Sequence, residues 1–127
     1  MKVKKIALDL KAELEPKGFT VLEEYTTPDK TRLDVAVMRG EEKLVALEFE
    51  KTYKWIQHRV LYNSIKAYRA GFGVIVFVYP FNKDSVINSW VMDFIQDTLR
   101  MKISIVSPDE CLSEVAGVLR QKGAAIL

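Results

Sequence analysis

Hydrophobic positions along the chain repeat with two periods, and the change between them marks the expected elements. Apolar residues recur at helical spacing over residues 4–15, 53–70 and 84–100, and again after residue 108. Alternating or continuous apolar runs predict strands over residues 19–25, 32–39, 43–50, 74–79 and 102–106. The run over 74–79 is apolar throughout, which is typical of a central strand buried on both faces. The expected order is α-β-β-β-α-β-α-β-α, an α/β fold with a mixed central β-sheet flanked by helices.

Turn and cap residues set the expected ends of the helices. Proline and glycine end a helix, whereas a small polar residue caps its start. These signals are Pro16 and Gly18 after the first helix, Gly71 after the second, Asp84 or Ser85 before the third, and Ser107 with Pro108 before the last, which is expected to end near Lys122 and Gly123.

Three carboxylates interrupt the apolar pattern of the hairpin expected over residues 32–50. Glu48 and Glu50 are two residues apart, so a strand places them on one face, with Leu47 and Phe49 on the other. Asp34 lies in the partner strand, near the end that a hairpin brings beside Glu48. Three carboxylates repel one another unless a proton or a cation intervenes. The pattern therefore favours a hard divalent metal held by oxygen ligands.

Composition narrows the chemistry that these acids can take part in. The 127 residues fit one globular domain over residues 1–127, with 49% apolar and 28% charged residues. A single cysteine, Cys111, excludes an intramolecular disulfide and a cysteine-based zinc site, and a single histidine, His58, argues against a Ser-His-Asp triad. No apolar run reaches the roughly 18 residues of a membrane span, and no signal peptide is visible, so a cytoplasmic location is expected.

Basic residues follow the acids directly. No Asp or Glu occurs from Lys51 to Ala70. The cations of this stretch are Lys51, Lys54, Arg59, Lys66 and Arg69, and the aromatic residues among them are Tyr53, Trp55, Tyr62 and Tyr68. A metal site beside a phosphate backbone would have this pattern, and so would an ordinary solvated helix face. The aromatic rings could stack on bases or pack in the core.

The order of elements and the placed acids resemble the PD-(D/E)XK nuclease superfamily, which includes restriction endonucleases and archaeal Holliday-junction resolvases. The resemblance covers roughly residues 4–80, and Arg32-Leu33-Asp34 resembles the strand-two motif. It implies a restriction-endonuclease-like fold and a magnesium ion, or manganese in its place, bound by Asp34 and Glu48. The literal Pro28-Asp29 pair lies in a loop and is interpreted as a decoy. Glu13, with Asp9 as the alternative, matches the acid that the family often carries on its first helix.

The sequence departs from this family at one position. Two residues after Glu48, where the family has a lysine, the chain has Glu50, and Lys51 follows it. The site could use an E-x-E variant of the motif, in which Glu50 holds a second metal or orients the attacking water. A bulge could turn Lys51 inward, or Lys54 or Lys66 could reach in from the next helix. The site could also have lost catalysis.

The resemblance implies a magnesium-dependent endonuclease that hydrolyses phosphodiester bonds in DNA, with RNA left open. Lys51, Lys54, Arg59, Lys66 and Arg69 would then hold phosphates. A chain of this size is expected to form a homodimer to cut two strands. The alternatives are a catalytically inactive module of the same fold that binds nucleic acid or a protein partner, and a structural α/β protein whose acids are only surface.

Overall fold

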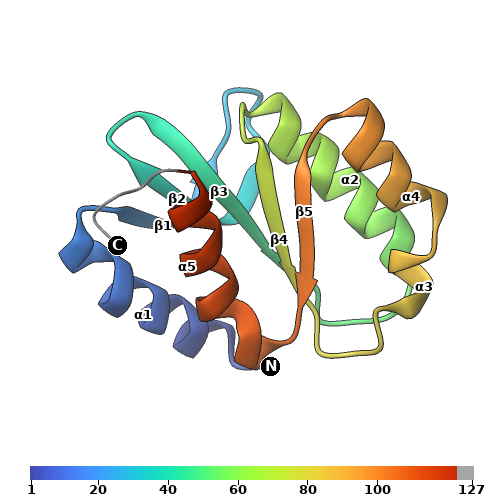
Figure 1. Cartoon of the computed structure of the whole chain (residues 1–127), viewed down its shortest axis with the longest axis horizontal. Helices are drawn as coiled ribbons and strands as arrows, with labels where there is room; N and C mark the ends of the chain where they lie inside the picture. Colours follow the sequence, from blue (N-terminus) through green and yellow to red (C-terminus); the bar gives the residue numbers. More distant parts are fainter. Residues whose placement is uncertain (123–127) are drawn as a thin grey trace.

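The computed structural model describes residues 1–122 and contains a five-stranded sheet with helices on both faces (Figure 1). The strands are β1 (Thr20–Thr26), β2 (Arg32–Arg39), β3 (Glu42–Phe49), β4 (Val74–Val78) and β5 (Lys102–Val106). The helices are α1 (Val3–Leu14), α2 (Ile56–Arg69), α3 (Asp84–Ile87), α4 (Trp90–Asp93) and α5 (Cys111–Gln121). None of the helices in this part of the chain combines the length and the apolar character needed to cross a membrane.

The sheet is mixed, as the sequence predicts. Its strand order is β1-β2-β3-β4-β5, with antiparallel pairing from β1 to β3 and parallel pairing from β3 to β5. The parallel pairs require crossovers, which α2 supplies between β3 and β4 and the α3–α4 segment supplies between β4 and β5. All five residues of β4 are buried, which confirms the prediction of a central strand.

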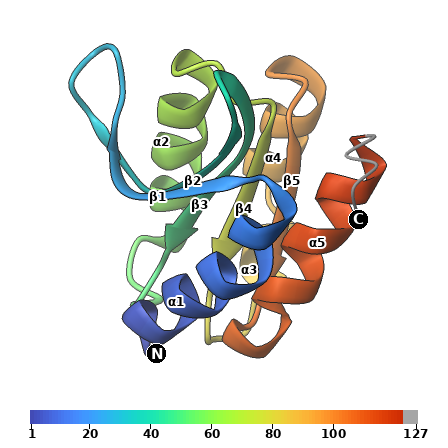
Figure 2. The same ribbon diagram turned by 90° about the vertical axis from the view of Figure 1, so that its left-hand side faces the viewer.

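Two apolar layers fill the space between the sheet and its helices. Helices α1 and α5 cover one face, and α2, α3 and α4 cover the other (Figures 1 and 2). Strand β3 serves both layers, because its side chains alternate between them: Leu47 and Phe49 pack with α1 and α5, whereas Ala46 packs with α2. The same alternation places Glu48 and Glu50 under α2.

The prediction of a single long helix over residues 84–100 is wrong. The segment forms α3, an extended residue at Ser89, α4, and a π-helical turn over Phe94–Thr98. The hydroxyl of Ser89 donates to the carbonyl of Val86 at 2.6 Å. Such a bond offers the backbone an alternative to the helix, so the apolar period continues while the helix breaks.

The expected helix ends are correct in part. Gly18 lies in the left-handed region (φ 93°) after the 3₁₀ turn that follows α1. A capping box of Ser107 and Glu110 begins the 3₁₀ turn that leads into α5. The start of α3 differs from expectation, because the side chain of Asn82 accepts the Asp84 N–H at 2.8 Å, so neither Asp84 nor Ser85 is the cap. Helix α5 ends at Gln121, and residue 123 lies outside the described residues.

Candidate functional site

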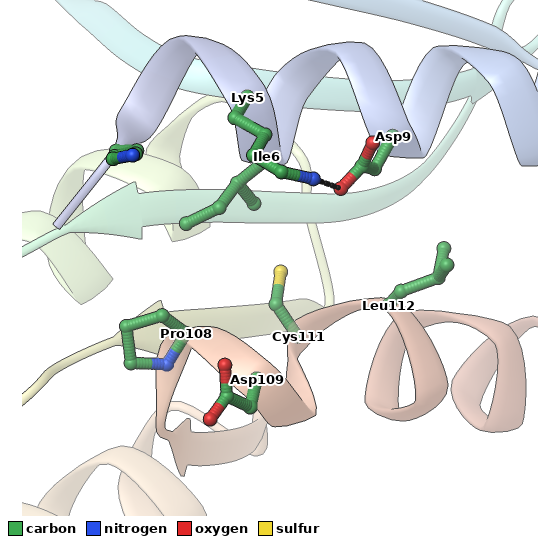
Figure 3. A pocket seen from close by; sticks show the side chains of 8 residues that line it. Lys5, Ile6, Asp9, Pro108, Asp109, Cys111 and Leu112 are labelled. Atoms are coloured by element: carbon green, nitrogen blue, oxygen red, sulfur yellow. Dashed lines mark hydrogen bonds and ion pairs between the residues drawn. The ribbon is translucent and has the colours of Figure 1, made fainter.

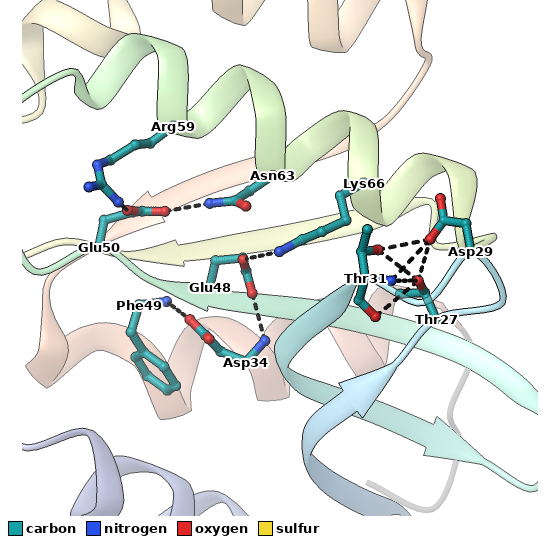
Figure 4. A network of polar contacts seen from close by, with 10 residues as sticks. All are labelled: Thr27, Asp29, Thr31, Asp34, Glu48, Phe49, Glu50, Arg59, Asn63 and Lys66. Carbon is teal, nitrogen blue, oxygen red and sulfur yellow. Dashed lines mark hydrogen bonds and ion pairs between the residues drawn. The ribbon is translucent and has the colours of Figure 1, made fainter.

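Strands β2 and β3 separate at Asp34, and side-chain carboxylates replace the backbone ladder there (Figure 4). The last backbone pair at this end joins Val35 to Leu47. Beyond it, the N–H of Asp34 donates to Glu48 Oε2 at 2.6 Å, and the N–H of Phe49 donates to Asp34 Oδ2 at 2.8 Å. The predicted approach of Asp34 and Glu48 is therefore correct, but each carboxylate accepts a backbone N–H of the opposite strand: Glu48 that of Asp34, and Asp34 that of Phe49.

Neighbouring strands accommodate this opening from both sides. On β1, Glu24 has a left-handed backbone (φ 53°). Glu24 and Asp34 stay unpaired between the Glu23–Val35 and Tyr25–Leu33 pairs, and the register of β1 with β2 is the same on both sides. On the other side β3 stays paired with β4, and the N–H of Glu50 donates to the Val78 carbonyl at 3.0 Å. At this point the backbone of β3 is thus paired with a neighbouring strand on one edge, and with the Asp34 side chain on the other.

Both glutamates are buried under α2. Each is 3% exposed. Lys66 Nζ donates to Glu48 Oε1 at 2.9 Å, and Asn63 Nδ2 donates to Glu50 Oε2 at 2.7 Å. The guanidinium of Arg59 lies 3.6 Å from Glu50 Oε1. Figure 4 shows these three side chains reaching from α2 toward the two carboxylates. We call Asp34, Glu48, Glu50 and Lys66 the carboxylate cluster.

One side of α2 supplies the side-chain partners of the two glutamates. Arg59, Asn63 and Lys66 are four and three residues apart, so they share one side of the helix. The sequence predicts Arg59 as a phosphate ligand, and Lys66 either as a phosphate ligand or as a lysine that reaches into the site; it misses Asn63. The signal for Asn63 is present: it is a polar residue at helical spacing from both cations, next to the buried Val60 and Ser64.

Burial shifts the proton affinity of both glutamates upward. Loss of solvent, and then the nearby charge of Asp34, raise the pKa of Glu48 to about 7, although the Asp34 N–H and the Lys66 ammonium oppose the shift. Burial also raises the pKa of Glu50, opposed chiefly by its hydrogen bond from Asn63 and by Arg59. Glu48 can therefore gain or lose a proton near neutral pH.

A small pocket opens to Asp34 from the α1 side of the sheet. It has a volume of about 110 Å³ and is lined by Val3, Glu23, Glu24, Asp34, Val35, Phe49 and Lys51. Lys51 thus lies on the side opposite Glu48, as strand alternation predicts, so this structure does not support the expectation of a bulge that turns Lys51 inward.

The first helix does not bring an acid to the cluster, which corrects the prediction for Glu13. Glu13 pairs with Lys17 at 2.9 Å, and Asp9 pairs with Lys5 at 3.0 Å, both on the exposed side of α1. The α1 residue that lines the pocket is Val3, ten residues before Glu13 and so roughly 15 Å away along the helix axis. Burial of Leu10 and Leu14 fixes this rotation of the helix.

The other predicted cations lie apart from the glutamates. Lys54 is exposed. Arg69 lies 3.4 Å from Asp29, which also accepts hydrogen bonds from Thr27 and Thr31 in the β1–β2 loop (Figure 4). The hydroxyls of these two threonines hold the pKa of Asp29 below its usual value. The Pro28-Asp29 pair is a loop feature, as expected of a decoy.

A second, larger pocket carries no comparable chemistry. It has a volume of about 420 Å³ and lies between α1 and the start of α5 (Figure 3). Of its ionisable residues, Lys5 and Asp9 are paired with each other. Burial raises the pKa of the Cys111 thiol to about 12, so it stays protonated and unreactive. The carboxylate cluster is the stronger candidate site.

The donor set of the cluster fits a magnesium ion that has few protein ligands. Within residues 1–122, no group of three or more His, Cys, Asp or Glu side chains is arranged to hold a metal. Magnesium, however, often takes only one or two carboxylates and completes its shell with waters and phosphate oxygens. Asp34 faces the small pocket, and each carboxylate oxygen that accepts one hydrogen bond keeps a second lone pair. Asp34 and Glu48 meet at the opening between β2 and β3 and would be the ligands of such an ion, although Glu48, like Glu50, accepts a hydrogen bond from α2.

Comparison with known proteins adds no relative: no family model matches the chain, and no curated protein matches it.

Proposed function

We propose that this chain is a metal-dependent nuclease that hydrolyses phosphodiester bonds in DNA, on a restriction-endonuclease-like fold. The observation that carries the proposal is the opening between β2 and β3, where Asp34 and Glu48 meet beside a buried lysine. Further support comes from the order of elements, since a leading helix, a three-strand meander, a helix and a buried strand are what the resemblance implies.

Asp34 and Glu48 would hold the magnesium ion. When bound, the ion would polarise the phosphate and lower the pKa of a coordinated water. A nearby cation would also favour the ionised form of Glu48, whose pKa of about 7 otherwise leaves it partly protonated.

Lys66 is the best candidate for the role that the family gives to the missing motif lysine. Its ammonium is 2.9 Å from Glu48, and its side chain is only 11% exposed. From this position it would neutralise charge that develops on the phosphate. Glu50 takes a positioning role, because its contacts with Asn63 and Arg59 hold α2 against β3 and so place Lys66.

A cleavage assay tests the proposal. Purified protein is incubated with supercoiled plasmid and with branched DNA in Mg²⁺ or Mn²⁺. We expect nicking that Asp34→Asn and Glu48→Gln abolish, and that Lys66→Met lowers at least about a hundredfold. Glu13→Gln is the matched control, since Glu13 is an acid outside the cluster and should leave cleavage unchanged.

The same experiment separates the rival function. Protein that binds DNA but never cuts it with either metal would be an inactive module of this fold, and the nuclease proposal would be wrong. Equal cleavage by Asp34→Asn and the unaltered protein would indicate a contaminant. Light scattering of the protein with and without DNA tests the proposed homodimer.

A further inference from the structure

Two aromatic side chains that could have packed in the core lie instead on the surface, at the start of α2 and along it. Trp55 is 73% exposed and Tyr62 is 62% exposed. Both rings are large enough to bury 150 Å² or more, so their exposure in a chain with a well-filled core is informative. The pattern alone left stacking and core packing open, and the structure places these two rings outside the core.

These two rings belong to a regular stripe along α2. Trp55, Arg59, Tyr62, Lys66 and Arg69 are spaced by four, three, four and three residues. Arg59, Tyr62, Lys66 and Arg69 lie in α2 and, at about 100° per residue, fall within an arc of roughly 80° on its surface. Trp55 has a left-handed backbone (φ 57°) and immediately precedes the helix. We call these five residues the α2 stripe. It alternates aromatic and cationic groups, and it borders the cluster, because Arg59 and Lys66 contact Glu50 and Glu48.

The cations of the α2 stripe keep donors available. Arg59 is half exposed, and its nitrogen is 3.6 Å from Glu50, too far for a good hydrogen bond. Arg69 is 66% exposed and contacts Asp29 at 3.4 Å through one of its nitrogens. A guanidinium has five N–H donors, so both can still bind phosphate oxygens. Lys66 is committed to Glu48, and its ammonium also lies 5.9 Å from the centre of the Tyr62 ring.

We propose that the α2 stripe binds unpaired DNA, with bases stacked on Trp55 and Tyr62 and phosphates held by Arg59 and Arg69. An aromatic side chain stacks on a base only when the face of that base is free, and stacking of this kind is sequence-tolerant. The two rings are seven residues apart, or roughly 10 Å along the helix. That separation is about three times the rise per base of a duplex strand, so the rings suit splayed bases.

Unpaired DNA fits the α2 stripe better than a second copy of the chain does. In a two-fold interface the α2 stripe would face itself, and its cations would meet like charges. No acid lies between residues 51 and 70 to offset them. A polyanion with exposed ring faces complements both the charge and the aromatic groups. The inference deepens the proposed nuclease function, on which its biological sense rests, by specifying single-stranded or branched segments as substrate.

Binding without cleavage tests the inference. Anisotropy of labelled oligothymidylate and of a blunt duplex of equal length is measured in EDTA, which prevents hydrolysis. We expect tighter binding of the single strand, weakened about tenfold or more in the Trp55→Ala/Tyr62→Ala protein, with duplex binding unchanged. Trp90→Ala is the matched control, because Trp90 is 63% exposed but lies on α4, outside the α2 stripe.

A fluorescence readout reports stacking directly. The chain has two tryptophans, so Trp55 is the sole one in a Trp90→Phe protein. Oligothymidylate should quench its emission, with a midpoint equal to the dissociation constant from anisotropy. Arg59→Gln should reduce the slope of log binding constant against log salt by about 0.7, the value for one phosphate contact on a single strand.

Several outcomes would overturn the inference: no quenching, equal affinity for strand and duplex, or an alanine double variant that binds as well as the native chain. A dimer that the double variant converts to a monomer would identify the α2 stripe as a self-interface instead. The two proposals fail separately. Quenching without cleavage in magnesium would overturn the nuclease proposal and support the binding surface. Cleavage that the double variant leaves unaffected would support the nuclease proposal and overturn the binding surface.

Discussion

The two faces of β3 differ in what holds them. Toward α1 and α5, Leu47 and Phe49 belong to a cluster of buried apolar residues that close packing holds. Toward α2, Glu48 and Glu50 are as deeply buried but need Lys66, Asn63 and Arg59 to compensate their charge. The first face adds stability in proportion to the apolar area it buries. The second costs free energy that its hydrogen bonds offset only in part.

The raised pKa of Glu48 shows that the compensation is incomplete. A fully compensated carboxylate would keep its ordinary pKa or fall below it, but burial and Asp34 outweigh Lys66 and the Asp34 N–H. A chain that needed only a folded sheet could have a valine at this position, as it has at Val45 in β3 and at Val35 in β2. Charges that are buried at a net cost are characteristic of functional sites.

Truncation of the apolar face should have the largest effect. Leu47→Ala leaves a cavity among residues that cannot all move in, so the free energy of unfolding should fall by about 2–5 kcal/mol. Chemical denaturation at pH 7 measures it. Leu8→Ala, on the exposed side of α1, should change the value by less than about 0.5 kcal/mol. Similar losses in the two variants would contradict the assigned layers.

Removal of the Glu48 charge should change the pH dependence of stability. The unfolded-state pKa of 4.5 is lower than the folded value of about 7, so the folded state binds more protons between these values. Glu48 therefore lowers stability progressively as pH rises from about 4.5 to 7, and its full cost is present above pH 7. The difference in unfolding free energy between Glu48→Gln and the native chain should shift in favour of the variant by up to about 3 kcal/mol from pH 4.5 to pH 8.

Denaturation curves in EDTA at several pH values measure this shift, because EDTA keeps metal from favouring the ionised carboxylate. A difference that stays constant over the whole range would show that Glu48 titrates at its ordinary pKa.

Replacement of Lys66 should lower the stability of the fold at pH values where Glu48 is ionised. Lys66→Met removes a charged hydrogen bond at 2.9 Å from a buried carboxylate, so stability should fall by about 2 kcal/mol at pH 8. The cost should shrink near pH 5, where Glu48 is protonated. Thermal unfolding at both pH values measures the difference, and equal losses would mean that Lys66 contributes through packing of its stem alone.

The smallest effect is expected at Glu13. Glu13→Gln breaks an exposed ion pair with Lys17 and should change the free energy of unfolding by less than about 0.5 kcal/mol. Nicking of plasmid should also be unchanged. A loss of cleavage without a loss of stability would place Glu13 in the site after all, and would require α1 to move when DNA binds.

Local periodicity determined most of the fold. The alternation over 43–50 predicts which residues of β3 face each layer, and the apolar run at 74–79 predicts the buried strand. These succeed because a side chain's direction is set by its own backbone period. The helix expected over 84–100 fails for a related reason, since the apolar period persists through Ser89 while a hydrogen bond of its side chain interrupts the backbone.

Which side chains meet in the carboxylate cluster depends on tertiary packing. From the sequence, Asp34, Glu48 and Glu50 could be grouped, because a hairpin brings them to one end. How α1 and α2 are rotated against the sheet decides the rest. The rotation of α2 brings Lys66 and Asn63, and not Lys54, to the glutamates, and the rotation of α1 turns Glu13 away from them. Burial of Leu10 and Leu14 in one helix and of Val60 and Ala67 in the other sets those rotations. Such contacts join residues far apart in the chain, so no local pattern contains them.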